Sequence, residues 1–356
     1  MKQVRNLLPA AILLAGCQSF ELPEDPDVRE TYVYEDPVPV VPASAETTPV
    51  PSTDDAADDP AIWIHPEDSS RSRILGTDKR SGLGLYSLDG DLVDFLPVGL
   101  PNNVDLRQSV KVGDRWIDLA AASNRVDDSV TLVLVSENGL VEAGRFPARR
   151  AEPYGFCMGH HAGEVLFFVT YKTGEVDLFR LGDGFTGEPL GTIEFGSQLE
   201  GCAFDDDSAL LVVGEEARGI WLVQLDPARD FAASAPELLD VTDGESGIAA
   251  DVEGVAIYHG EPRRIVASSQ GNDSYVLYDF QDRTFVGRFR IGRSGAVDGS
   301  QETDGLEVTS LSLGDRYPKG ILVVQDGFNA PGNSAQNFKI VDWREIERAL
   351  HNEPAP

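Results

Sequence analysis

Residues 253–257 read Glu-Gly-Val-Ala-Ile and residues 200–204 read Glu-Gly-Cys-Ala-Phe, in each case an acidic residue before a short, mostly apolar run. Starts of this kind, with an acidic or polar residue first, recur along the chain. The six starts are Asp59, Asn103, Tyr154, Glu200, Glu253 and Asp304, spaced by 44, 51, 46, 53 and 51 residues. Such a period is typical of a repeat protein in which every repeat forms one supersecondary unit.

Each start is followed by further short apolar runs separated by Gly, Asp and Asn turns, which is the pattern of β-strands joined by hairpins. The second runs cover 74–79, 119–125, 166–172, 210–216, 264–272 and 321–326, and the third runs cover 84–88, 130–135, 176–181, 220–225, 275–280 and 338–343. Five repeats have a fourth run, at 92–98, 140–146, 190–195, 237–241 and 285–291. This pattern predicts an all-β fold, a six-bladed β-propeller with four to five antiparallel strands per blade. A pair of β-sandwiches is the alternative fold.

The sixth repeat has no fourth run. The segment around residues 31–41 contains a patch of β-forming residues, and we expect it to supply the missing outer strand and close the ring. Helical periodicity occurs only near Trp343–Leu350. The content of 35 Gly and 22 Pro also favours a turn-rich β protein over a helical bundle.

The 356 residues include 29 Lys and Arg against 60 Asp and Glu, which gives a formal net charge of −31. This charge argues against nucleic acid as a partner, because binding phosphates of nucleic acid requires clustered basic residues. The acidity suits a protein that collects cations, and adaptation for solubility or high salt is the alternative. We expect the chain to act as a monomer.

The first residues have the pattern of an export signal. Lys2 and Arg5 precede the apolar run 7–15, which is too short to span a bilayer. The run ends in Leu-Ala-Gly-Cys, which resembles a bacterial lipobox with Cys17 as the lipidated first residue of the mature protein. We expect a signal peptide at 1–16, an acidic Pro-rich tether at 17–45 and the propeller domain at 46–356. The protein is then exported and lipid-anchored at the cell envelope, on the outer membrane or cell surface; secretion after cleavage without a lipid is the alternative.

Two further cysteines, Cys157 and Cys202, lie inside the repeats. An oxidising compartment would allow them to form one disulfide. Buried free thiols are nevertheless the preferred interpretation of this pair.

The repeat starts carry most of the chemistry, because the first strand of each propeller blade lines the central channel. Four of the six starts are carboxylates, and Asp58 and Asp251 lie close by in sequence. Carboxylates held together in a partly dry site repel each other strongly, so a cation is needed to neutralise them. Several hard oxygen ligands without sulfur or imidazole predict several Ca²⁺ ions. A solvated acidic rim without metal is the alternative.

The ends of the second strands form another ring, which is asymmetric in charge. Blades one to three finish with Lys79, Arg125 and Lys172, whereas the other three blades finish with acidic or amide side chains. Three basic residues that face a metal cluster predict a binding site for a multiply charged anion such as phosphate. Read one by one, they would be ordinary surface charges. His160 and His161 are adjacent on a strand, so they point to opposite faces and make a poor ligand pair.

Several segments resemble the β-propeller phytases. They include Asp55-Ala-Ala-Asp-Asp-Pro-Ala-Ile-Trp63, Gly76-Thr-Asp-Lys-Arg-Ser-Gly-Leu83, Pro101-Asn-Asn-Val-Asp-Leu-Arg107, Asp251-Val-Glu-Gly254 and Gln336-Asn-Phe-Lys339. The resemblance runs from about residue 46 to the C-terminus. It implies a calcium-dependent phosphomonoesterase that acts on phytate, myo-inositol hexakisphosphate, or its calcium complex. In such an enzyme a calcium-bridged water attacks phosphorus, so no protein nucleophile is required.

The resemblance also implies roles for individual residues. Phosphate groups of the substrate would be bound by Lys79, Arg125 and Lys172. The catalytic set would be these three residues together with Tyr154, Glu200 and Glu253. The calcium cluster would be held by Asp58, Asp59, Tyr154 through its backbone oxygen, Glu200, Glu216, Asp251, Glu253 and Asp304, and a structural calcium by Glu46 and Asp298.

One position departs from the family pattern. Thr173 follows Lys172 where these phytases commonly have an acidic residue, which leaves substrate preference open. Two other functions also remain open. One is a calcium propeller that hydrolyses a lactone or phosphodiester, and the other is a calcium-dependent binding propeller without catalysis.

Overall fold

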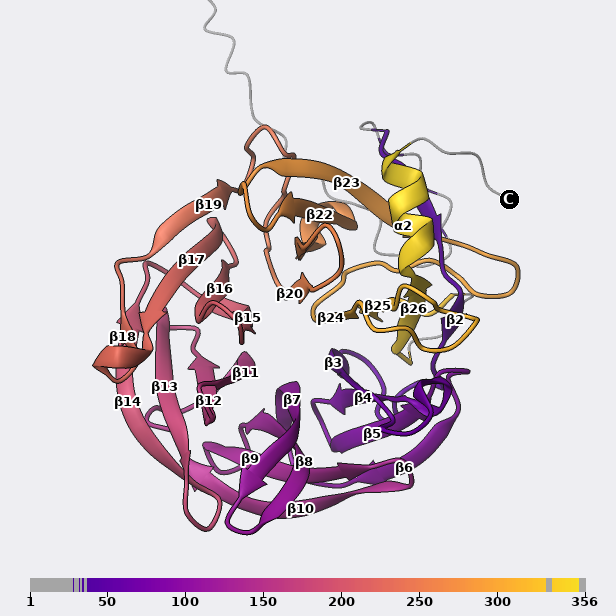
Figure 1. Cartoon of the computed structure of the whole chain (residues 1–356). Helices are drawn as coiled ribbons and strands as arrows, with labels where there is room; N and C mark the ends of the chain where they lie inside the picture. The colour runs from indigo at the N-terminus through magenta and orange to yellow at the C-terminus, as the bar shows by residue number, and fades with distance from the viewer. Residues whose placement is uncertain (1–27, 29–31, 33, 35–36, 331–334, 352–356) are drawn as a thin grey trace, which may run out of the picture.

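The computed structural model describes residues 28, 32, 34, 37–330 and 335–351, and these form six small β-sheets arranged in a ring (Figure 1). Each sheet is one blade, and its strands run in sequence order from the central axis to the rim, apart from two short N-terminal strands at the outer edges of two blades. The predicted six-bladed propeller is confirmed. None of the helices in this part of the chain is long and apolar enough to cross a membrane.

Strands at equivalent positions in the six blades have similar bounds. The innermost strands are β3 (Ala57–Trp63), β7 (Pro101–Val112), β11 (Phe156–His161), β15 (Leu199–Asp205), β20 (Val255–Tyr258) and β24 (Leu306–Thr309). The second strands are β4 (Arg73–Asp78), β8 (Arg115–Asn124), β12 (Glu164–Thr170), β16 (Leu210–Glu215), β21 (Arg264–Ser269) and β25 (Ile321–Asp326). The third strands are β5 (Gly82–Ser87), β9 (Ser129–Ser136), β13 (Glu175–Gly182), β17 (Gly219–Asp226), β22 (Ser274–Asp279) and β26 (Asn337–Asp342).

The outer strands of blades one to five are β6 (Leu92–Leu96), β10 (Gly139–Pro147), β14 (Thr186–Glu194), the pair β18 (Ala232–Ala233) and β19 (Glu237–Val241), and β23 (Phe285–Gly292). Short 3₁₀ turns lie at Ser69–Arg71, Pro227–Arg229 and Gln270–Asn272. The predicted helix is confirmed as α2 (Trp343–Leu350). It packs on the rim through Ile346 and through Trp343, whose ring stacks on Tyr258 with centroids 3.7 Å apart.

The N-terminal segment closes the ring, but not with the residues predicted. The outer strand of blade six is β2 (Ala45–Glu46), which pairs antiparallel with β26 (Figure 1). The preceding strand β1 (Val40–Pro42) pairs in parallel with β23 and so extends blade five instead. The prediction that residues 31–41 complete blade six is therefore wrong. Backbone bonds from Ser44 and Thr47 to β26 show that the chain reaches the open edge of this blade only after residue 42.

The glycine that follows several repeat starts has a packing reason. A Cβ atom on Gly155 would lie 1.9 Å from the carbonyl oxygen of Glu200, and one on Gly201 would lie 2.0 Å from that of Glu253. The backbone of one blade therefore touches the start of the next blade at the channel. At this contact the Gly201 N–H donates to the Glu253 carbonyl at 2.8 Å. Any side chain here would separate neighbouring blades.

Cys157 and Cys202 form a disulfide, so the preference for free thiols is wrong. The two residues lie on β11 and β15, the innermost strands of blades three and four, with Cα atoms 5.6 Å apart. This separation is in the range that a disulfide spans. Sequence alone gave no measure of how closely two innermost strands approach.

Candidate active site

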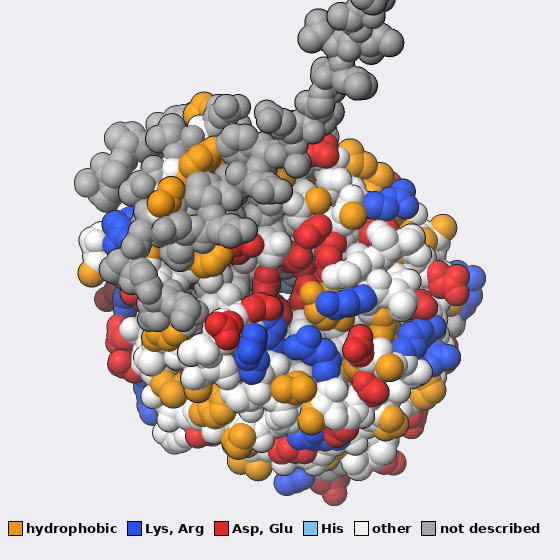
Figure 2. All heavy atoms as spheres, turned by 180° about the vertical axis from the view of Figure 1, so that it is seen from behind, with side chains coloured by type: hydrophobic (Ala, Val, Ile, Leu, Met, Phe, Trp, Pro, Cys, Tyr) orange, Lys and Arg blue, Asp and Glu red, His pale blue; other side chains and the backbone are white. Residues whose placement is uncertain are grey.

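The repeat starts come together at one mouth of the central channel. Asp59 is the third residue of β3, and Glu200 is the second residue of β15. Each of the other three, Tyr154, Glu253 and Asp304, lies two residues before an innermost strand. Figure 2 shows this face, where acidic side chains gather around a central hollow and basic side chains lie along one side of it. The geometry expected from the repeat is thus present.

Three glutamates form the tightest group. Glu200, Glu216 and Glu253 each offer a carboxylate oxygen, and these three oxygens lie within 4.8 Å of one another. Burial and the neighbouring charge of Glu200 raise the pKa of Glu253 well above its usual value. Burial also raises the pKa of Glu216 to about 7, although Gln198 donates a hydrogen bond to it at 2.6 Å. Asp251 lies beside this group, and its pKa is raised by burial and by Glu200.

A second group joins blades one and six around Lys79. The Lys79 Nζ lies 3.2 Å from Asp58, 3.0 Å from Asp304 and 2.7 Å from Asp55. Burial alone would lower the pKa of Lys79, but these carboxylates raise it above its usual value. One ammonium does not balance them, since burial still raises the pKa of Asp304 to about 7 and that of Asp58 well above normal.

The other two predicted phosphate-binding residues lie on the same side of the mouth. Arg125 approaches the Lys79 carbonyl, with an N–O distance of 3.4 Å, and its Nε is buried with no partner among the described residues. The ammonium of Lys172, which is exposed, lies 4.1 Å from the centroid of the Tyr154 ring. The Tyr154 carbonyl, a predicted metal ligand, accepts a hydrogen bond from the Ser123 hydroxyl. Burial and the nearby carboxylates raise the pKa of the Tyr154 hydroxyl above its usual value.

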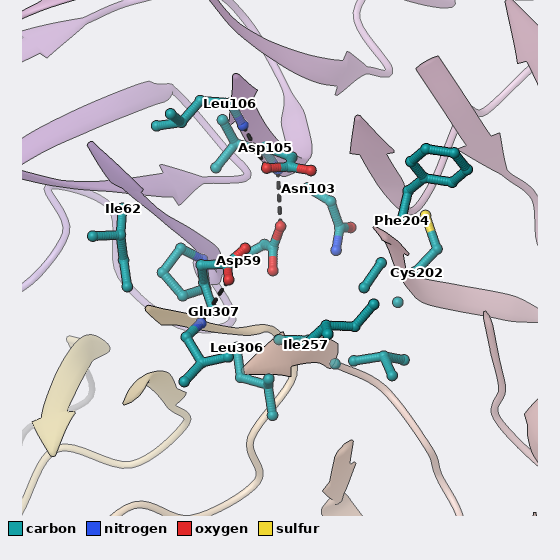
Figure 3. A pocket seen from close by; sticks show the side chains of 18 of the residues that line it. Asp59, Ile62, Asn103, Asp105, Leu106, Cys202, Phe204, Ile257, Leu306 and Glu307 are labelled. Atoms are coloured by element: carbon teal, nitrogen blue, oxygen red, sulfur yellow. Dashed lines mark hydrogen bonds between the residues drawn. The ribbon is translucent and has the colours of Figure 1, made fainter. Parts of the chain in front are cut away.

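The side chain of Asp59 points in a different direction from that of its neighbour Asp58. Figure 3 shows its side chain pointing into a cavity of about 380 Å³ in the channel, together with Asn103 and Asp105. There Asp59 accepts a hydrogen bond from the Val104 N–H at 3.0 Å. Asp58 therefore faces the mouth group, where it contacts Lys79, and Asp59 faces the channel, at an irregularity in the pairing of β3 with β4.

Several buried acceptor atoms at the mouth lack a donor. Within the described part of the chain, no hydrogen bond or ion pair reaches Oδ1 of Asp58, Oε2 of Glu253 or Oδ1 of Asn102. Buried acceptors without donors are rare in proteins and destabilising. Oxygen atoms of this kind are the ligands that Ca²⁺ prefers, so the residues present fit a calcium cluster.

The predicted structural calcium site contains a lysine. The ammonium of Lys339, whose side chain is fully buried, contacts Asp298, Glu46 at 2.6 Å and Asp326 at 3.1 Å. Asn337 donates to Glu46 at 3.2 Å, while its own Oδ1 is buried and unpaired in the residues described. Three carboxylates against one ammonium leave net negative charge, so this group also fits an additional cation.

Sequence reasoning missed several residues that contact the site. Asn102 and Gln270 donate to Glu200 at 2.8 Å and to Asp304 at 2.7 Å. Asp105 and Glu307 line the channel cavity near Asp59, and burial raises the pKa of Glu307 to about 8. The available signal was position, because Asn102 precedes a repeat start while Asp105 and Glu307 follow starts on the channel face.

Two histidines and Thr173 lie outside the mouth group. His161 Nδ1 contacts the Asp206 carbonyl at 2.7 Å, and neither His160 nor His161 belongs to a possible metal group among the described residues. Such a group is formed instead by Asp205, Asp207 and His259, where Arg263 already pairs with Asp205. Thr173 is exposed and donates a hydrogen bond to Glu175.

Comparisons with known proteins agree on one family. The chain matches the family model described as Phytase over residues 10–355. A relative described as 3-phytase, from Bacillus subtilis (strain 168), is 37% identical over 348 residues. The aligned region covers 92% of this chain and 90% of that protein, so the likeness extends through all six blades.

Proposed function

Because this chain belongs to the phytase family, we propose that it hydrolyses phytate, or calcium phytate, to lower inositol phosphates and inorganic phosphate in a calcium-dependent reaction. Membership and the 3-phytase relative support a phosphoric monoester hydrolase. The observation that carries calcium dependence is the set of buried acceptor atoms without donors at Asp58, Glu253 and Asn102. They lie beside basic residues suited to phosphate, so metal and substrate would meet at one mouth.

Calcium would be held by the mouth group. Its ligands would be Asp58, Glu200, Glu216, Asp251, Glu253, Asp304 and the Tyr154 carbonyl, with Asp59 facing a channel position. Bound there, calcium would act as a Lewis acid that lowers the pKa of water and polarises a phosphoryl oxygen. Glu46 and Asp298, together with the unpaired Oδ1 of Asn337, support a further structural ion.

The basic residues would bind and orient phosphate groups. Lys79 lies between Asp58 and Asp304, so its ammonium can contact a phosphoryl oxygen at the edge of the acidic group. Arg125 has an unpaired buried Nε next to Lys79 and can bind the same or an adjacent phosphate. Lys172 is exposed, and its contact with the Tyr154 ring directs its ammonium toward the mouth. These roles make no use of a protein nucleophile.

We also propose that the protein is exported, anchored through a lipid on Cys17 and active as a monomer. The signal peptide and lipobox lie outside the described residues. The disulfide between Cys157 and Cys202 supports export, because disulfides persist mainly in oxidising compartments.

The test is phosphate release from phytate near neutral pH by the purified chain, first with calcium and then with excess EDTA. Release only with calcium supports the proposal. Phytate binding without release would instead indicate a binding propeller. Hydrolysis of a lactone or phosphodiester, with phytate untouched, would indicate a different ester substrate.

A further inference from the structure

Asn102 is a fully buried amide on β7, in blade two, at the edge of the mouth group. Its Nδ2 donates to Glu200 Oε1 and to Asn103 Oδ1, both at 2.8 Å. The amino group therefore faces two acceptor oxygens, to which an amide N–H can donate. The amide orientation is thereby fixed, and the carbonyl oxygen must occupy the other position.

That carbonyl oxygen has nothing to accept. Asn102 Oδ1 is buried and receives no hydrogen bond from any described residue. Oδ1 of Asp58 and Oε2 of Glu253 share this condition. All three residues interact with Glu200, by a hydrogen bond from Asn102 and by charge from Asp58 and Glu253. The residues with unpaired acceptors therefore all interact with one carboxylate.

The position of Oδ1 is compatible with a shared cation. The oxygen and nitrogen of one amide lie about 2.2 Å apart, so Asn102 Oδ1 is within about 5 Å of Glu200 Oε1. The carboxylate oxygens of Glu200, Glu216 and Glu253 are separated by up to 4.8 Å. The upper limit of about 5 Å for Asn102 Oδ1 is close to this spacing, which is compatible with an oxygen that shares a cation with the group.

We propose that Asn102 is a calcium ligand through Oδ1, a neutral oxygen added to the group of Glu200, Glu216 and Glu253. This inference rests on the proposed function, because it assumes that calcium binds there. Amide oxygens are ordinary calcium ligands, and a neutral one adds coordination without adding to the repulsion among the carboxylates. Through it, blade two would join blades four and five in holding the metal.

The competing role is purely orienting, in which the Asn102 amino group fixes Glu200 and the oxygen does nothing. Asn102→Ala and Asn102→Asp separate the two roles. The Asp variant keeps an oxygen at the Oδ1 position but loses the donor to Glu200. If Asn102 only orients Glu200, the Asp variant should bind calcium no better than the Ala variant, since two carboxylates would then face each other.

Gln198→Ala is the matched control. Gln198 also donates an amide hydrogen bond to a carboxylate of the group, to Glu216 at 2.6 Å. Its own oxygen is not among the buried unpaired acceptors. This variant therefore removes an orienting hydrogen bond without removing a proposed ligand.

Calcium is titrated calorimetrically into each EDTA-stripped full-length variant, after a thermal melt has shown that it is folded. We expect Asn102→Ala to weaken calcium binding at least roughly tenfold, Gln198→Ala less than about threefold, and Asn102→Asp to stay within about threefold of the unaltered protein or bind more tightly. Equal losses in Asn102→Ala and Gln198→Ala, or an Asp variant as weak as the Ala variant, overturn the assignment.

Two further outcomes are distinguishable. If Asn102→Ala does not fold, the comparison of Asn102→Asp with Gln198→Ala decides, because loss of affinity in the Asp variant alone contradicts a ligand role. If the unaltered protein binds no calcium, the proposed function fails rather than the assignment of Asn102 alone.

Discussion

Without calcium, the protein should become less stable as pH rises from 5 to 8. Burial raises the pKa of Glu216 from 4.5 to about 7 and that of Asp304 from 3.8 to about 7. Between the unfolded and folded pKa values, the folded state binds more protons than the unfolded chain. Stability is therefore fully present below the unfolded pKa and is lost as pH rises through the folded pKa.

The size of the effect follows from Glu216, which is largely buried. A tenfold change in proton affinity corresponds to about 1.4 kcal/mol, so the shift from 4.5 to about 7 gives about 3 kcal/mol of lost stability. Coupling with Glu200 and Asp251 prevents simple addition of further groups. For a chain of this size, the melting temperature should fall by roughly 4 °C.

The assay is thermal unfolding in EDTA and in calcium across this pH range. Calcium needs ionised ligands, so its affinity should rise with pH and the fall in stability should disappear. Because the net charge of −31 also destabilises the protein at high pH, Glu216→Gln serves as the control and should flatten the EDTA profile. A stability in EDTA that is constant or rises between pH 5 and 8 would refute the reasoning. So would an unchanged slope in Glu216→Gln.

Three substitutions test other parts of the molecule. Lys79→Met should lower kcat/KM for phytate by roughly 100-fold or more while calcium affinity by calorimetry is kept or increased, since a phosphate ligand and a competing cation are both removed; unchanged kcat/KM would contradict its role. Replacing Cys157 and Cys202 by Ser should lower the free energy of unfolding in urea by about 4 kcal/mol, because the disulfide closes a loop with a sequence separation of 45. Reducing the disulfide in the unaltered protein should lower the free energy of unfolding by the same amount, and an unchanged free energy in the Ser variant would contradict the prediction. Lys339→Met should destabilise the protein in EDTA by about 3–5 kcal/mol because three carboxylates lose their counter-charge. Calcium should restore part of that stability in a melt, and failure to do so would argue against an ion at Glu46 and Asp298.

The blade architecture could be predicted because each repeat start is set by local physics. The glycines after Tyr154 and Glu200 are needed where neighbouring blades touch, and a glycine follows the start of each of the last four repeats. The strand donated to blade six leaves no such mark. Only two residues, Ala45 and Glu46, pair with β26, and a strand that short has no periodicity to detect.

The sequence could predict that these charged side chains lie near one another, but not how each side chain is oriented. Asp58 and Asp59 are adjacent in sequence, yet the first lies 3.2 Å from Lys79 and the second accepts a hydrogen bond in the channel. Asn102 was missed because a neutral amide gives no signal in a search for clustered charge. Its proposed role depends on an amino group that donates to Glu200 and an oxygen that accepts no hydrogen bond from the described residues. Such hydrogen bonds can be assigned only from atomic coordinates.

The acidic group also explains how a ring of separate sheets could couple stability to metal binding. Glu200 and Glu253 come from blades four and five, and Asp304 and Asp58 from blades six and one. At these junctions backbone hydrogen bonds run from Gly201 to Glu253, from Val252 to Glu216 and from Gly305 to Asp58. Repulsion between the carboxylates therefore acts across junctions between blades, and a cation bound there would reverse it. Ligands contributed by different blades should then make calcium both a catalytic requirement and a cross-link, so that variants weakening its binding lose melting temperature and activity together.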